Sequence, residues 1–94
     1  MIKVIVERRV KKGSEVEFHQ LLREVKSAAT LYPGYISGET LTAVDDPHRT
    51  LVVANFTDME SFRKWQENPD RLKIIARLES LLESAPVTSV YRMA

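Results

Sequence analysis

Residues 51–65, LVVANFTDMESFRKW, join an apolar run with strand character to a segment with helical spacing. In the strand predicted here, Leu51 and Val53 lie on one face, and Val52 and Phe56 lie on the other. Both faces are apolar, whereas a sheet covered by helices on one side normally presents polar residues on its other side. We therefore expect both faces of this strand to be covered.

The rest of the chain alternates between strand and helix signals. An N-terminal strand would place Ile2, Val4 and Val6 on one face, with Lys3 and Glu7 on the other. Helix starts are indicated by capping boxes, in which Ser or Thr precedes Glu by three residues, and by an Asn before Pro. We predict strands over residues 2–10, 35–44, 50–56 and 87–93, and helices beginning at the signals Ser14–Glu17, Thr57–Glu60 and Asn68–Asp70.

Turn residues separate these elements. The Pro33-Gly34 pair ends the first helix, because Pro cannot continue a helix and Gly tolerates the turn. The cluster Asp45–Arg49 predicts a turn that joins the second and third strands as an antiparallel hairpin. Gly38, inside the second strand, predicts a bulge or a close backbone approach.

The element order predicts an α+β, ferredoxin-like βαββαβ fold with a four-stranded antiparallel sheet, formed by one domain over residues 1–94. Right-handed crossovers place the helices on one side of the sheet. The other side is then bare in a monomer, although it carries Ile5, Leu51 and Val53. The expected cover is a second copy of the chain, so we predict a homodimer that packs sheet against sheet.

Composition excludes several classes of protein. Hydrophobic residues make up 44% and charged residues 29%, which is typical of a globular domain. With 14 Lys and Arg against 13 Asp and Glu, the net charge of +1 excludes a nucleic-acid binder held by bulk charge. No stretch approaches the roughly 18 apolar residues of a membrane span. The chain has no Cys and its start lacks the pattern of a signal peptide, so we expect a cytoplasmic protein.

Four stretches resemble the antibiotic-biosynthesis-monooxygenase-like family of the dimeric α+β barrel superfamily. They are MIKVIVERRV at the start, the Pro33-Gly34-Tyr35 turn, the Asp45-Asp46-Pro47 hairpin and the segment quoted above. The resemblance covers nearly the whole chain. It implies a dimer that oxidises an aromatic polyphenol or quinol with O₂ and needs no cofactor. The substrate anion would supply the electrons, and the protein a dry pocket with a few polar groups.

The sequence departs from the enzymes of that family at specific positions. Val52, Phe56 and Phe62 stand where a polyketide-oxidising member carries Asn, Trp and Tyr. The haem-degrading branch is matched at Trp65, but its haem-ligating His falls at Ile75, which cannot bind iron. Haem degradation is therefore disfavoured. The loss of polar positions favours an alternative function, a non-catalytic small-ligand-binding or regulatory dimer of the same fold.

Two residues are candidates for catalysis. His19 could act as a general base near neutral pH, or face solvent as an ordinary helix residue. Asn55, a polar amide on a largely apolar strand, could hold a substrate or bond to backbone. His48, in the predicted turn, belongs to no metal-binding pattern, so no metal site is expected.

The candidates for ligand binding are mostly aromatic. Trp65 would serve as core or as a lid over the pocket. Arg8 shares the face of Val4 and Val6, so its burial would need a carboxylate or a ligand anion; the other outcome is a strand end in solvent. Tyr35 and Tyr91 could present pocket hydroxyls or simply pack. The predicted ligand-binding set is Arg8, Phe56, Phe62, Trp65 and Tyr91.

Overall fold

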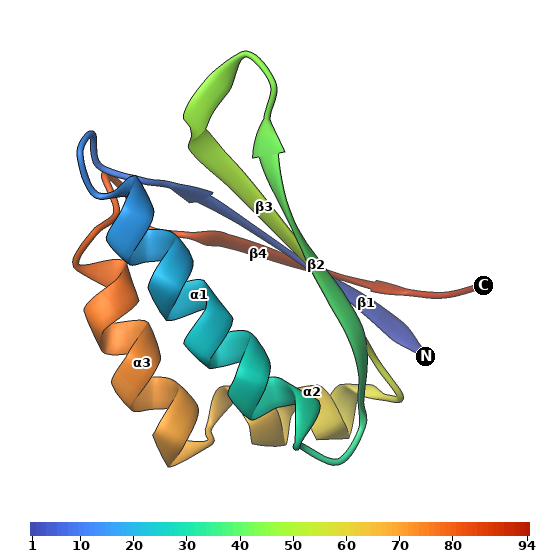
Figure 1. The fold of residues 1–94 in the computed structure, drawn as a ribbon. Coiled ribbons are helices and arrows are strands. Elements are labelled where there is room, and N and C mark those ends of the chain that lie inside the picture. The colour runs from blue at the N-terminus through green and yellow to red at the C-terminus, as the bar shows by residue number, and fades with distance from the viewer.

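The computed structural model describes residues 1–94 and has one antiparallel sheet with three helices against one of its faces (Figure 1). The strands lie in the order β2-β3-β1-β4. This arrangement confirms the predicted α+β, ferredoxin-like βαββαβ fold. The elements are β1 (Ile2–Arg9), α1 (Glu15–Thr30), β2 (Tyr35–Ala43), β3 (Asp46–Phe56), α2 (Met59–Gln66), α3 (Pro69–Glu79) and β4 (Val87–Arg92).

Strand register decides which residues face the helices. Val4 pairs with Ala54, and Val6 with Val52, so these four side chains share one face of the sheet. Phe56 continues that face at the end of β3 and is only 2% exposed. The buried core has two parts. One contains Ile2, Val4, Ala29, Phe56, Phe62 and Trp65, and the other contains Val10, Phe18, Leu21, Leu22, Leu78 and Leu82.

Helix capping differs from the prediction at two of the three helix starts. Ser14 precedes α1 without a side-chain capping bond, and Glu15 instead accepts a hydrogen bond from the Gly13 backbone N–H at 3.3 Å. In α2 the cap is Asp58 and not Thr57, because the Asp58 carboxylate accepts from the Ser61 N–H at 2.8 Å. The third start is confirmed: Asn68 caps α3, and Pro69 follows it at the first helical position.

The hairpin turn is shorter than predicted. Only Val44 and Asp45 form it, and β3 begins at Asp46, four residues before the predicted start. The reason is that Asp46 takes part in the strand: its carboxylate accepts the His48 N–H at 3.0 Å and pairs with Arg9 at 3.0 Å. A polar residue that is typical of a turn can therefore lie in a strand here, because Arg9 of the neighbouring strand β1 pairs with Asp46.

The face of the sheet away from the helices, called the open face below, carries apolar side chains without cover. Ile5, Leu51 and Val53 are half-buried at its centre. Leu41 is 45% exposed and Val87 56% exposed on the flanking strands. The apolar character that the sequence indicates is therefore present on this face. None of the helices has the length and apolar character needed to cross a membrane.

Candidate functional site

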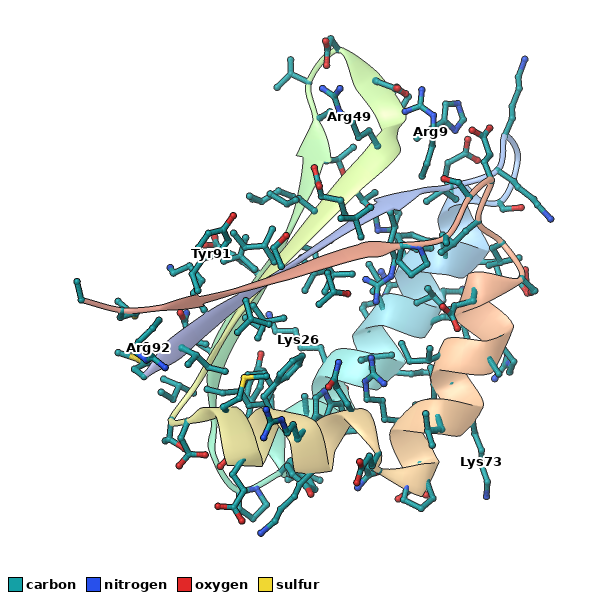
Figure 2. All side chains as sticks on the ribbon, turned by 180° about the vertical axis from the view of Figure 1, so that it is seen from behind. Arg9, Lys26, Arg49, Lys73, Tyr91 and Arg92 are labelled. Atoms are coloured by element: carbon teal, nitrogen blue, oxygen red, sulfur yellow. The ribbon has the colours of Figure 1, made fainter.

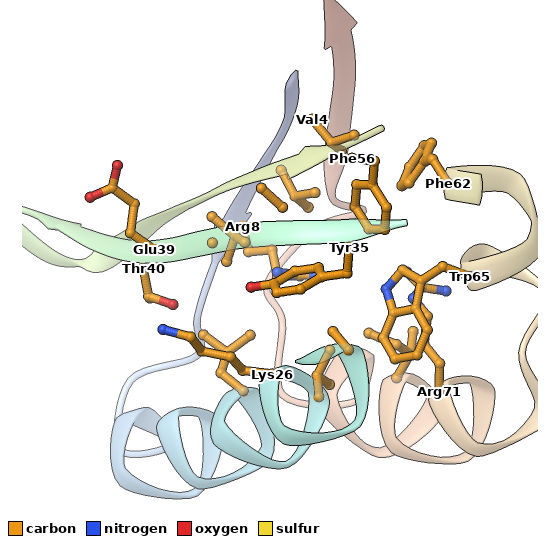
Figure 3. A pocket seen from close by; sticks show the side chains of 18 residues that line it. Val4, Arg8, Lys26, Tyr35, Glu39, Thr40, Phe56, Phe62, Trp65 and Arg71 are labelled. Atoms are coloured by element: carbon orange, nitrogen blue, oxygen red, sulfur yellow. The ribbon is translucent and has the colours of Figure 1, made fainter. Parts of the chain in front are cut away.

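A cavity of about 90 Å³ lies between the sheet and the helices (Figure 3). Its floor is formed by side chains of the helix-facing side of β1 and β3, namely Val4, Val6, Val52 and Ala54. These are small or β-branched residues that leave space above the sheet where larger side chains would fill it. The alternation of β1 and β3 therefore positions the cavity as well as the core.

One end of the cavity is walled by aromatic rings. Phe62 and Trp65 come from α2, and their rings face Phe56 of β3 and Tyr35 of β2 (Figure 3). The ring centroids of Phe56 and Phe62 are 5.3 Å apart, and those of Tyr35 and Phe56 are 5.6 Å apart. Burial raises the pKa of the Tyr35 hydroxyl, so this group stays protonated and can donate a hydrogen bond.

Two guanidinium groups also line the cavity. Arg8 comes from β1 and is only 8% exposed, yet its Nε has no hydrogen-bond partner. Burial, and secondly the charge of Arg71, lower the pKa of Arg8 to about 10, and Glu79 acts in the opposite direction. Arg71 comes from the first turn of α3, and one of its guanidinium nitrogens donates to the Gln66 carbonyl at 3.1 Å. Burial lowers its pKa too.

The mouth of the cavity lies between α1 and the edge strand β2. Lys26 and Thr40 both line the cavity and are exposed. Figure 3 shows the Lys26 ammonium group below the Thr40 hydroxyl, on the helix side of β2, whereas the Glu39 carboxylate points to the other side of that strand. Charged side chains directed into the cavity are thus basic.

The structure brings four of the predicted site residues together. Arg8, Phe56, Phe62 and Trp65 all line the cavity. Arg8 has the buried position that the sequence left as one of two outcomes. Tyr35, named from the sequence as a pocket hydroxyl or a packing residue, also lines the cavity.

The other predicted residues lie elsewhere. His19 packs edge-on against the Phe18 ring, with centroids 5.5 Å apart, outside the cavity lining. Asn55 lies on the open face and donates to the Ser37 hydroxyl at 3.0 Å. Tyr91 pairs in register with Lys3, is 57% exposed and also lies on the side away from the helices (Figure 2). A catalytic role of His19 and Asn55 and a ligand-binding role of Tyr91 stay predictions.

Sequence reasoning missed Arg71, Lys26 and Thr40. Lys26 and Thr40 read as ordinary surface residues, and only the packing of α1 beside β2 brings them together. Arg71 carries one weak signal. A cation in the first turn of α3 opposes the helix dipole, which favours acidic residues there. No group of His, Cys, Asp and Glu side chains in the chain is placed to hold a metal ion.

The fold of this chain is similar to that of several known proteins. The family model described as "Antibiotic biosynthesis monooxygenase" matches residues 1–77. A conserved protein from Methanosarcina mazei Go1 has a similar structure, with a TM-score of 0.94 and 18% identity over 99% of this chain and 92% of that one. SnoaB, a cofactor-independent oxygenase from Streptomyces nogalater, is similar with a TM-score of 0.87 and 19% identity over 99% of this chain and 93% of that one. No curated protein matches the chain by sequence.

Proposed function

The chain belongs to the antibiotic biosynthesis monooxygenase family, and from this we propose that it is a cofactor-independent monooxygenase acting on a small aromatic polyphenol or quinol. The observation that carries the proposal is the cavity, which combines aromatic walls with the buried guanidinium of Arg8 and the half-buried one of Arg71. The similarity to SnoaB gives the fold and is consistent with this chemistry.

The proposed reaction needs little from the protein. A quinol with a free ring C–H takes one oxygen atom from O₂ at that carbon and becomes a hydroxyquinone, and the second oxygen atom leaves as water. The substrate itself supplies all the electrons, and its ionised form donates the first of them to O₂. The protein has to bind the ring, exclude water and stabilise the oxyanion, and the cavity offers aromatic rings and donors for these tasks. Its volume of about 90 Å³ favours a single ring over a fused polyketide.

We propose that the active form is a homodimer. Ile5, Leu51 and Val53 form an apolar centre on the open face, and contiguous exposed apolar surface of this kind commonly marks an interface. A two-fold axis lets the same patch cover itself.

One observation favours a second function, binding without catalysis. The charged groups directed into the cavity are cations, and neither His19 nor Asn55 lines it. A cavity without a general base suits a ligand-binding or regulatory dimer as well as an oxygenase.

Oxygen uptake under air separates these functions. We would incubate the protein with hydroquinone and alkyl-substituted single-ring hydroquinones, with the same quinols in buffer as the blank. The test variant is Ala54→Phe, which fills the cavity floor, and the control is Ala76→Phe on the exposed side of α3. The oxygenase requires uptake above the blank that is lost in Ala54→Phe and retained in Ala76→Phe. Uptake equal to the blank for every quinol, together with saturable quinol binding, would leave the binding function.

A further inference from the structure

The Arg8 side chain is a buried charge without a counter-ion in its own chain. Buried charges in proteins are normally paired or hydrogen-bonded, because removing an ion from water is costly. None of the ion pairs in the structure includes Arg8 or Arg71. The Arg8 Nε has no partner, although it is fully enclosed. The Arg8 guanidinium can therefore bind an anion that comes from outside the chain.

No acidic residue near the cavity takes that role. The Glu39 carboxylate points away from the cavity (Figure 3). Glu79 is exposed on α3 and influences Arg8 and Arg71 only through its field. Lys26 adds a third positive charge at the mouth. The electrostatic character of the space between Arg8 and the aromatic wall is therefore cationic.

The position of Arg71 adds an independent observation. It lies at the third residue of α3, where the Asn68 side-chain Oδ1 already accepts hydrogen bonds from the Asp70 and Arg71 backbone N–H groups. A half-buried cation at this end of a helix is unfavourable because it opposes the helix dipole and because it is partly removed from water. Both penalties are offset when an anion binds between the two guanidinium groups.

We propose that Arg8 and Arg71 form a subsite for the oxyanion of a planar aromatic ligand, with the ring against Phe56 and Trp65. The ligand carries an anionic oxygen group on an aromatic ring, and this group is either a phenolate or a carboxylate. Its role in turnover rests on the proposed function, and it specifies the substrate as one that binds already ionised. The guanidinium pair then replaces a general base, because it favours the ionised form of the bound phenol.

Binding measured without oxygen tests the subsite separately from catalysis. Trp65 is the only Trp of the chain and lines the cavity, so its fluorescence reports occupancy. Benzoate and benzamide have the same shape and differ in charge. We expect benzoate to bind roughly 10- to 100-fold more tightly, the range expected for charge-assisted hydrogen bonds. Calorimetry checks each affinity, and the absorbance of 4-nitrophenol shows whether it binds as phenolate.

Substitutions then identify the groups responsible. Arg8→Met and Arg71→Met should each lower the preference for benzoate over benzamide at least several-fold, while Arg77→Met, exposed on the same helix, should retain it. Anion preference carried by benzoate, by 4-nitrophenolate or by both, and lost in Arg8→Met, supports the subsite. Equal affinity for benzoate and benzamide without phenolate binding, or a preference that survives in both variants, overturns it. Oxygen uptake without anion preference would reject the subsite alone, and anion preference without uptake would reject the oxygenase alone.

Discussion

The hydroxyl of Tyr35 lies directly over Gly38 in β2, so that a Cβ at position 38 would meet the Tyr35 oxygen at 2.5 Å. The register shift between Tyr35 and Ser37 places Tyr35 and Gly38 on the same face, since Tyr35 pairs with Phe56 and Gly38 with Ala54. The sequence predicts a bulge or a close backbone approach at Gly38; the structure has a register shift just before it, and the close approach comes from the Tyr35 side chain. Gly38 therefore holds Tyr35 in the cavity by leaving room for it.

Gly38→Ala should destabilise the protein through this contact. Either the Tyr35 ring leaves its position or the strand shifts, and overpacking of this kind costs about 1–3 kcal/mol. In a Tyr35→Phe background the hydroxyl is absent, and the next ring atom, Cζ, would lie 3.4 Å from the new Cβ. Urea unfolding of the two single variants and the double variant should then show that Gly38→Ala costs less without the hydroxyl. Equal costs in both backgrounds would contradict the contact.

Arg8→Met should stabilise the ligand-free protein. The substitution replaces a buried, unpaired guanidinium by an apolar side chain of similar length, and we expect a gain of about 1–3 kcal/mol in the free energy of unfolding. Urea unfolding without ligand measures it, and Arg77→Met, which removes an exposed cation, should change the midpoint little. A loss of stability in Arg8→Met would show that Arg8 supports the fold and would weaken its assignment to a ligand.

Acid stability depends in part on Asp58. Hydrogen bonds from the backbone and side chain of Ser61 lower the pKa of this carboxyl below its ordinary value of 3.8. A lowered pKa means that the carboxylate contributes stability above 3.8 and loses it as the pH falls through the folded-state value. Asp58→Asn keeps a capping side chain but cannot titrate. Its melting temperature should therefore fall less steeply below about pH 4 than that of the wild type.

The measurement compares how steeply the melting temperatures of the wild type and Asp58→Asn fall with decreasing pH. Asp46, whose pKa is also lowered, chiefly by the His48 backbone N–H, contributes equally to both proteins and cancels. Parallel acid limbs for wild type and Asp58→Asn would mean that the Ser61 bonds do not persist in solution.

The sequence predicted the fold because two-residue alternation places Val4, Val52 and Phe56 on one face without knowledge of their partners. It predicted the cavity less well. Arg71 reaches the cavity because α3 packs against α1, a long-range relation that no local pattern encodes. His19 shows that closeness in sequence to the core does not place a residue in the cavity. A helix turns by about 100° per residue, so His19 has different surroundings from the buried Phe18 that precedes it.

Val53→Glu tests the predicted homodimer at the centre of the open face. Val53 pairs with Ile5 on one side and Glu39 on the other, so a carboxylate here would enter the proposed interface beside a second carboxylate and without a counter-ion. Lys73→Glu, on an α3 side chain that points away from the body of the protein (Figure 2), is the control that places the same carboxylate outside the open face. Sedimentation should give the wild type and Lys73→Glu about twice the chain mass of 10.8 kDa, and Val53→Glu a single chain mass. A wild type that sediments as a single chain at micromolar concentration would refute the dimer and leave the open face without its proposed cover.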